Sequence, residues 1–75
     1  MELYNKKIMI FGMGVSGKGV ARLLKSQGSS MVLYDGNEEL DKAALLKELG
    51  LEEKAEVITG ELKKESFEGI DVLAL

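Results

Sequence analysis

The chain has 75 residues with no cysteine, no histidine and no proline, and its formal net charge is −3. This composition allows one small domain and excludes a disulfide framework, a thiolate or histidine metal site and Ser-His catalysis within the chain. The negative charge argues against non-specific nucleic-acid binding, and no apolar run approaches the ~18 residues of a membrane span. With no signal peptide at its start, the chain is expected to be soluble and cytoplasmic, without membrane contact.

A strand over residues 8–11 is expected first, because this apolar run of four residues is typical of a buried strand in a parallel sheet. It runs into the sequence Gly12-Met13-Gly14-Val15-Ser16-Gly17, a G-x-G-x-x-G fingerprint, and then into a helix expected from about Ser16 to Gln27. Gly12 allows a sharp turn, Gly14 lets a ligand approach the backbone, and Gly17 lets the helix pack closely on the sheet.

The start of this helix is a candidate anion site, because its first N–H groups lack helical acceptors and lie at the positive end of the helix dipole. The backbone N–H groups of Val15 and Ser16 are the candidate phosphate donors, and the Ser16 hydroxyl is expected to cap the helix. The half with this turn, residues 1–37, holds five Lys/Arg and two acidic residues, which suits an anionic small molecule. The alternative is a glycine-rich turn without a ligand.

The same stretch also fits most of a P-loop, G-x-x-x-x-G-K, from Gly12 to Lys18. A P-loop continues with a serine or threonine whose hydroxyl binds Mg²⁺, and this chain has Gly19 there. A phosphoryl-transfer loop is therefore the weaker interpretation.

The first helix is expected to bury Val20, Ala21 and Leu24, with Leu23 widening the apolar stripe, and to end at Gly28. A second strand is expected over residues 31–34.

The second strand ends at Asp35, and Gly36-Asn37 then predicts a turn whose asparagine caps a helix over residues 38–49. That helix is expected to bury Leu45, Leu46 and Leu49 and to end at Gly50-Leu51 in a Schellman motif.

Asp35 lies eighteen residues after Gly17, where an acidic side chain can accept hydrogen bonds from a ribose diol or a base N–H. The alternative is an aspartate that only shapes the turn with Gly36. The other acidic residues form no paired-carboxylate catalytic site, so no catalytic residue and no metal ligand is assigned.

A third strand over 56–59, a short helix within 61–69 and a fourth strand over 70–75 complete the pattern. Strands that alternate with helices predict an α/β fold, here a Rossmann-like parallel sheet with flanking helices and the strand order 3-2-1-4. Because the sequence stops in an apolar run, we expect residues 1–75 to be one truncated N-terminal domain of a longer protein.

The sequence resembles the N-terminal UDP-binding domain of the Mur ligases, and most of all their D-glutamate-adding branch. In that family the turn reads G-x-G-x-[ST]-G and is followed by a helix, a glycine, a strand and an aspartate. The resemblance is carried by residues 7–17, Ala21-Arg22-Leu23-Leu24, Gly28, Val32, Asp35 and 69–75. The last stretch is similar to the strand that precedes the family's Ser-Pro-Gly loop.

The resemblance implies an ATP-dependent ligase of three domains that activates the carboxylate of UDP-N-acetylmuramoyl-L-alanine with Mg-ATP and joins it to D-glutamate in peptidoglycan synthesis. This chain would bind no cofactor itself, since ATP, Mg²⁺, D-glutamate and the catalytic lysine belong to the other domains, and it would be inactive alone. By matching positions, Val15 and Ser16 would contact the diphosphate, and Asp35, Gly36 and Asn37 would lie against the uridine. The family often has Thr and Arg at the last two positions, so Gly36 and Asn37 depart from its pattern.

Two other functions remain open from the residues themselves. An NAD(P)- or FAD-binding domain of an oxidoreductase has the same fingerprint. A regulatory nucleotide sensor is the non-enzymatic alternative, and such a protein is expected to oligomerise.

Overall fold

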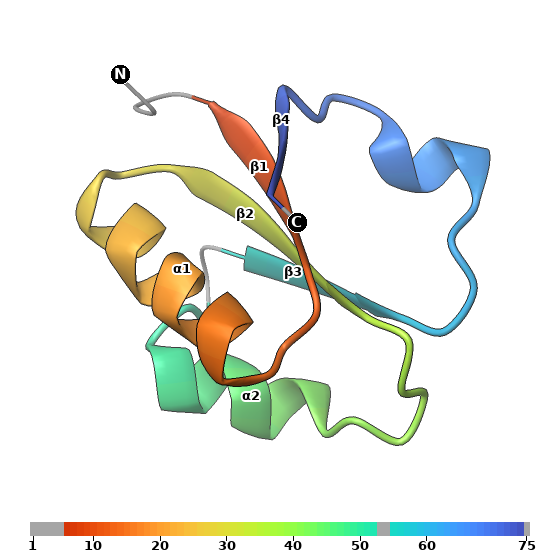
Figure 1. Cartoon of the computed structure of the whole chain (residues 1–75), viewed down its shortest axis with the longest axis horizontal. Helices are drawn as coiled ribbons and strands as arrows, with labels where there is room; N and C mark the ends of the chain where they lie inside the picture. The colour runs from red at the N-terminus through yellow and green to blue at the C-terminus, as the bar shows by residue number, and fades with distance from the viewer. Residues whose placement is uncertain (1–5, 53–54, 75) are drawn as a thin grey trace.

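The computed structural model describes residues 6–52 and 55–74, which alternate between strands and helices along the chain (Figure 1). The elements are β1 (Lys7–Phe11), α1 (Val15–Ser26), β2 (Ser30–Asp35), α2 (Lys42–Leu49), β3 (Ala55–Thr59), the 3₁₀ helix η1 (Lys64–Phe67) and β4 (Val72–Ala74). Each expected strand and helix is therefore present, and the short helix expected within 61–69 is η1. Leu75, the last residue of the expected fourth strand, lies outside the described residues.

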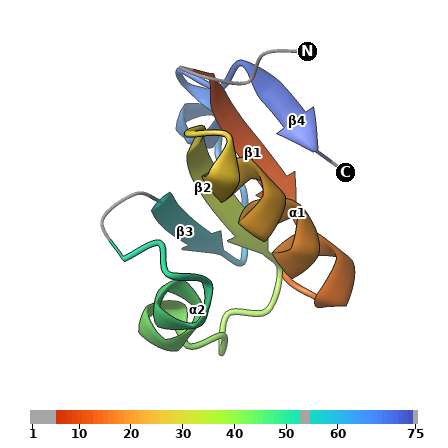
Figure 2. The ribbon, with the colours of Figure 1, turned by 90° about the vertical axis from the view of Figure 1, so that its left-hand side faces the viewer.

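The four strands form one parallel sheet in the order β3-β2-β1-β4, as expected from the sequence. In Figure 2 the four arrows point the same way, and α1 lies in front of the sheet. The connection from β3 to β4, which contains η1, runs on the other side of the sheet from α1 (Figures 1 and 2). The chain therefore reverses its direction across the sheet beside β1, so the carboxyl ends of β1 and β4 flank the topological switch point.

The main core lies between one face of the sheet and the two α-helices. The strand register places Ile8 beside Met31 and Ile10 beside Leu33 on this face. The other members are contributed by the glycine turn, the helices and the end of α2: Met13, Ala21, Leu24, Leu45, Leu49 and Leu51. Leu46, expected on the buried edge of α2, is only partly buried and packs against this cluster.

Both α-helices end at a glycine in the left-handed region, as the sequence predicted. Gly28 has φ 75° and Gly50 has φ 68°. At the end of α2 the N–H of Gly50 donates to Lys47 O at 3.2 Å and the N–H of Leu51 donates to Leu46 O at 2.9 Å, which is the Schellman pattern. Leu51 is fully buried after this turn, so the motif directs the chain back into the core.

The expected N-caps of both helices were wrong, although α1 begins within one residue of the expected Ser16. Helix α1 begins at Val15 with Gly14 as its N-cap, so Ser16 is a residue of the first turn and its hydroxyl is not the cap. Helix α2 begins four residues later than expected, at Lys42. Its N-cap is Asp41, whose carboxylate accepts the Ala44 N–H at 3.0 Å. Asn37 Oδ1 instead accepts the Glu39 N–H at 3.0 Å, which closes a local turn before the helix can start.

The buried stripe of α1 is also narrower than expected. Ala21 and Leu24 are buried, but Val20 is 37% exposed and Leu23 is 61% exposed. Helix α2 packs along one flank of α1, and the flank that carries Val20 and Leu23 is the opposite one. An apolar residue on the edge of a helical stripe is buried only where a neighbouring element covers it.

Replacing Leu24 with alanine is expected to lower the free energy of unfolding by about 2–5 kcal/mol, because it empties a site in the core between α1 and the sheet. The matched control is Leu23→Ala in the same helix turn, which should change stability by no more than about 0.5 kcal/mol. Urea unfolding followed by circular dichroism measures both. Equal losses in the two variants would contradict the observed burial.

Candidate functional site

The candidate site is built around the glycine turn that joins β1 to α1. Gly12 has φ +86°, a conformation that L side chains rarely adopt, and its N–H donates to Tyr34 O at 2.7 Å. A Cβ at Gly17 would overlap the Gly12 carbonyl oxygen and lie 2.9 Å from the carbonyl carbon. These two glycines are therefore required by the fold, one for the turn and one for the close approach of α1 to it.

Gly14 differs from the other two, because nothing in the protein requires a glycine there. Its backbone is extended, with φ −79° and ψ −166°, and a Cβ built on it would meet no atom within 4 Å. The space over Gly14 is thus open, and the approach of a ligand to it stays a prediction.

The first turn of α1 presents uncompensated hydrogen-bond donors beside this open space. Among the described residues, no side chain caps the helix and no acidic residue lies in its first turn. The N–H groups of Val15, Ser16 and Gly17 have no acceptor within the helix, because the first helical hydrogen bond is donated by Lys18 to Gly14 O at 3.0 Å. With the helix dipole, this arrangement can bind an anion such as a phosphate.

Asp35 lies at the carboxyl end of β2, next to the glycine turn. Its Oδ2 accepts the Met13 N–H at 2.8 Å and its Oδ1 accepts the Asn37 N–H at 2.9 Å. These bonds, the one from Asn37 first and the one from Met13 second, hold the pKa of the Asp35 carboxyl below its ordinary value of 3.8, against the weaker opposite effect of burial. The stabilisation they contribute is therefore present above that ordinary value and is lost as the pH falls through the lowered pKa.

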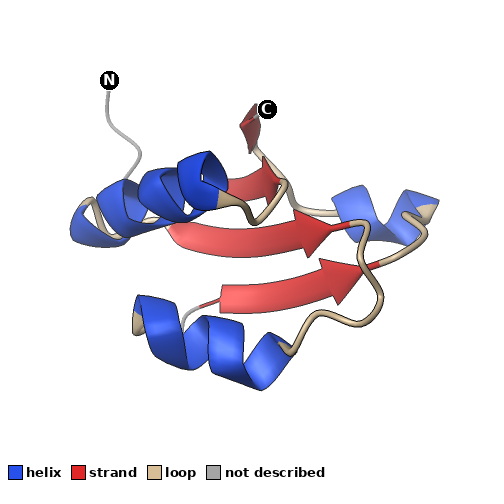
Figure 3. Ribbon diagram, turned by 60° about the horizontal axis from the view of Figure 1, so that its bottom comes forward, coloured by secondary structure: helices blue, strands red, loops and turns tan. Residues whose placement is uncertain are grey.

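The loop from Asp35 to Asp41 forms the other wall of the candidate site. In Figure 3 this loop and the glycine turn both follow the arrowheads, at the same end of the sheet. Asn37 Oδ1 accepts the Glu39 N–H and Asn37 O accepts the Leu40 N–H at 3.2 Å, so local bonds shape the loop. Gly36 lies near the Tyr34 hydroxyl, which itself donates to Gly60 O. The structure thus places all eight predicted site residues at one end of the sheet, in the glycine turn, in the first turn of α1 and around the end of β2: Gly12, Gly14, Val15, Ser16, Gly17, Asp35, Gly36 and Asn37.

A small cavity beside the glycine turn was not predicted from the sequence. It has a volume of about 80 Å³ and is lined by Ile10, Phe11, Ser16, Gly17, Val20 and Ala74. It exists because β4 pairs with β1 while α1 crosses above them, so the strand order 3-2-1-4 was the only signal that could have pointed to it. The cavity lies at the switch point, next to the helix start.

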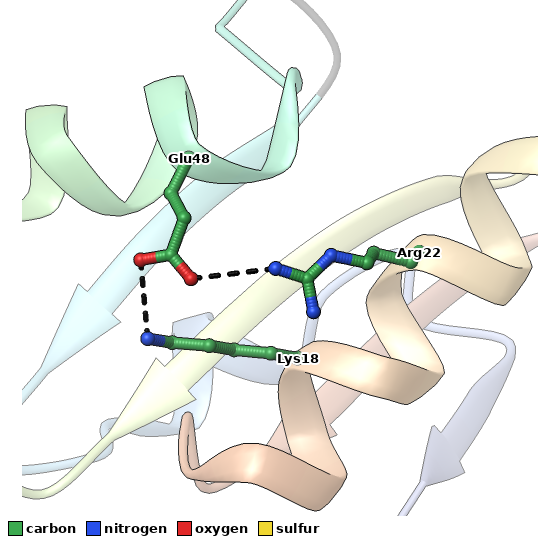
Figure 4. Close-up of polar contacts among 3 residues, drawn as sticks. All are labelled: Lys18, Arg22 and Glu48. Carbon is green, nitrogen blue, oxygen red and sulfur yellow. Dashed lines mark hydrogen bonds and ion pairs between the residues drawn. The ribbon is translucent and has the colours of Figure 1, made fainter.

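The geometry of Lys18 does not fit a P-loop. A P-loop lysine reaches the phosphates, whereas Lys18 Nζ lies 3.2 Å from Glu48 Oε1 on α2. Figure 4 shows Lys18 and Arg22 converging on this carboxylate, with Arg22 Nη2 3.4 Å from Glu48 Oε2. These two ion pairs join α1 to α2 and direct the Lys18 side chain away from the glycine turn.

Two further observations concern metals and membranes. In the described ranges, no group of three or more carboxylates is placed to hold a metal ion. Within the same ranges, neither the length nor the apolar character of any helix would let it cross a bilayer.

Sequence comparison matches residues 6–75 with the family described as Mur ligase MurD-like, N-terminal domain. Proteins named UDP-N-acetylmuramoylalanine--D-glutamate ligase align with the whole chain, at 41% identity in Lachnospira eligens and 36% in Lachnoclostridium phytofermentans. The protein of that name from Caldanaerobacter subterraneus is 35% identical over the same 75 residues. The chain spans 16% of the length of each of these three relatives.

Solved structures share the fold. The apo-structure of D-lactate dehydrogenase from Escherichia coli superposes with a TM-score of 0.65 and 27% identity, covering 97% of this chain and 20% of that one. A crystal structure of a protein from Pyrococcus horikoshii OT3 superposes with a TM-score of 0.68 and 35% identity, covering the whole chain and 20% of the other protein. The Rossmann-like sheet expected from the sequence is thereby confirmed.

Proposed function

The chain belongs to the family of Mur ligase MurD-like N-terminal domains, and from this membership we propose that it is the nucleotide-sugar-binding domain of an ATP-dependent ligase. The reaction proposed for the longer protein joins D-glutamate to UDP-N-acetylmuramoyl-L-alanine in peptidoglycan synthesis, in the cytoplasm. The names of three relatives that align with all 75 residues support this proposal. The chain spans 16% of the length of each, so most of the ligase would belong to other domains. Residues 1–75 are proposed to act as its first domain.

The observation that carries the proposal is the uncapped start of α1 under the open space at Gly14. The diphosphate of the substrate would accept hydrogen bonds from the N–H groups of Val15 and Ser16, which have no other acceptor in the helix. Gly14 would let the phosphate approach the backbone, while Gly12 and Gly17 maintain the shape of the turn. A diphosphate also supplies the negative charge that the helix dipole favours.

The uridine is proposed to lie toward the loop that begins with Asp35, Gly36 and Asn37. This loop is next to the glycine turn, since the Asp35 carboxylate accepts the Met13 N–H. Gly36 and Asn37 lack the Thr and Arg side chains of the family pattern described in the sequence analysis, so backbone groups of this loop would make more of the contacts with the base.

The residues of this chain do not fit an ATP or Mg²⁺ site. Gly19 stands where a P-loop has its hydroxyl, Lys18 is paired with Glu48, and the described residues contain no carboxylate cluster for a metal. Carboxylate activation and attack by D-glutamate are therefore assigned to the remainder of the ligase, and the chain alone is expected to be inactive. Its own task is to bind the nucleotide end of the substrate and so to orient the distant carboxylate.

Calorimetric titration with UDP-N-acetylmuramoyl-L-alanine, UDP and NAD tests the proposal. We expect binding of the nucleotide-sugar, competition by UDP and no comparable response to NAD. NAD also carries a diphosphate for the glycine turn, so the expected difference rests on recognition of uridine by the Asp35 loop. NAD is included because the D-lactate dehydrogenase shares the fold. Tight binding of NAD with no response to the UDP-sugar would contradict the proposal and favour an oxidoreductase domain.

A further inference from the structure

The Asp35 carboxylate connects the two loops of the candidate site. Met13, in the glycine turn, and Asn37, in the loop after β2, are 24 positions apart in the sequence. Both donate their backbone N–H to this one side chain, at 2.8 Å and 2.9 Å. One carboxylate therefore joins the two loops, in addition to the backbone bond from the Gly12 N–H to Tyr34 O.

Asp35 is itself held firmly by the sheet. Its carbonyl accepts the Gly60 N–H at 3.1 Å, and the carbonyl of the preceding residue, Tyr34, accepts the Gly12 N–H at 2.7 Å. The ladder between β2 and β3 includes Asp35 itself, opposite Thr59. The carboxylate is consequently a fixed point to which the less regular turn is attached.

Met13 connects the Asp35 carboxylate to the proposed phosphate donors, the N–H groups of Val15 and Ser16. Its side chain is 5% exposed and belongs to the core, so Met13 is held by packing on one side and by the Asp35 carboxylate on the other. The next residue, Gly14, is the N-cap whose carbonyl accepts the first helical hydrogen bond of α1. A shift of Met13 would move Gly14 and, with it, the N–H groups of Val15 and Ser16.

We propose that Asp35 is a positioning residue, which contributes to nucleotide binding by fixing the glycine turn against the loop after β2 and not by holding the ribose hydroxyls. This inference rests on the proposed function. Each carboxylate oxygen already accepts one backbone N–H, from Met13 or from Asn37, and these two bonds fix the orientation of the carboxylate and join the two loops through it. Removing the acceptor would leave the part-buried Met13 N–H without a partner, and such a group moves to find another one.

The test compares Asp35→Asn and Asp35→Ala with the intact natural protein, using UDP, 2′,3′-dideoxy-UDP and N3-methyl-UDP as ligands. The dideoxy compound lacks the diol and the N3-methyl compound lacks the base N–H, so together they separate positioning from direct contact with the ribose or the base. Affinities come from calorimetry, and hydrogen-exchange mass spectrometry follows the peptides that contain Met13 and Asn37. Asp71→Asn is the matched control, because Asp71 Oδ2 also accepts a backbone N–H, that of Lys7 at 2.9 Å, at the opposite end of the sheet.

We expect Asp35→Asn to weaken the binding of all three ligands by the same factor, about tenfold, and to speed exchange at Met13 and Asn37. Asp71→Asn should leave all three affinities unchanged. A loss with UDP that disappears with either analogue, or an unchanged affinity for all three, would overturn the positioning role. If Asp35→Ala does not fold, Asp35→Asn keeps one acceptor oxygen and provides the same comparison. Failure of the natural protein to bind UDP at all would instead overturn the proposed function.

Discussion

Gly17→Ala is expected to be the most destabilising single substitution in the glycine turn, with a loss of about 3–5 kcal/mol in the free energy of unfolding. The added Cβ would overlap the Gly12 carbonyl oxygen, which is a backbone atom and cannot rotate away as a side chain could. Gly12 cannot move easily either, because its N–H is bonded to Tyr34 O. A chain of this length has a total stability of roughly 4–11 kcal/mol, at 0.05–0.15 kcal/mol per residue, so the loss would remove at least about a quarter of the stability and, at the low end of this range, all of it.

The matched control for this substitution is Gly19→Ala, two residues further along the same helix. A Cβ at Gly19 would meet no atom within 4 Å, so alanine should stabilise the helix by up to about 1 kcal/mol. Urea unfolding of the two variants, measured by circular dichroism, should give changes of opposite sign. A Gly17→Ala protein as stable as the natural one would show that α1 does not approach the turn as closely as described.

Gly14→Val is expected to have the opposite profile: a folded protein that no longer binds its nucleotide. Valine is compatible with the extended backbone at Gly14, and its side chain would stand in open space, so the stability should change by less than about 1 kcal/mol. The branched side chain would occupy the volume that the phosphate needs. The expected loss of affinity for UDP is about 100-fold or more, equal to about 2.8 kcal/mol at 1.4 kcal/mol per tenfold.

The series from glycine through alanine to valine at position 14 makes this prediction sharper. Affinity measured by calorimetry should fall with each added carbon, while the unfolding midpoint stays nearly constant. Unchanged affinity in Gly14→Val would mean that the ligand does not lie over this turn.

The sequence was sufficient to predict the layout of the sheet. Continuous apolar runs separated by helical patterns predicted four parallel strands, and the glycine fingerprint after the first run predicted the strand order that the structure has. The helix ends at Gly28 and Gly50 were also predicted, because a glycine just after a helical pattern is a local signal, strengthened at Gly50 by the apolar Leu51 that follows it.

The errors arose where local signals competed or where burial depended on distant elements. Asn37 and Asp41 are both good capping residues. Because the Asn37 side chain closes a turn with Glu39, the helix starts later and Asp41 is its N-cap. Leu23 has the right spacing for the core, but α2 packs on the other flank of α1. No pattern in the sequence indicates such neighbours.

The sequence could predict which residues form the candidate site, but not the hydrogen bonds between them. The eight candidate residues lie in the glycine turn, in the first turn of α1 and around the end of β2, and contacts with a ligand remain predictions. The bond between Met13 N–H and the Asp35 carboxylate depends on how β1 and β2 align, and this register appears only in the folded protein.

The three glycines of the fingerprint are needed for different reasons, two for the fold and one for the proposed binding, so their presence in a related sequence has different meanings. Positions 12 and 17 would be kept by any descendant that still folds, whether or not it had lost its substrate. Position 14 alone would be free to drift once binding ceased to matter. A homologue with a bulky residue there and glycine at the other two places would be a folded relic of a nucleotide site, outwardly similar and unable to hold a diphosphate.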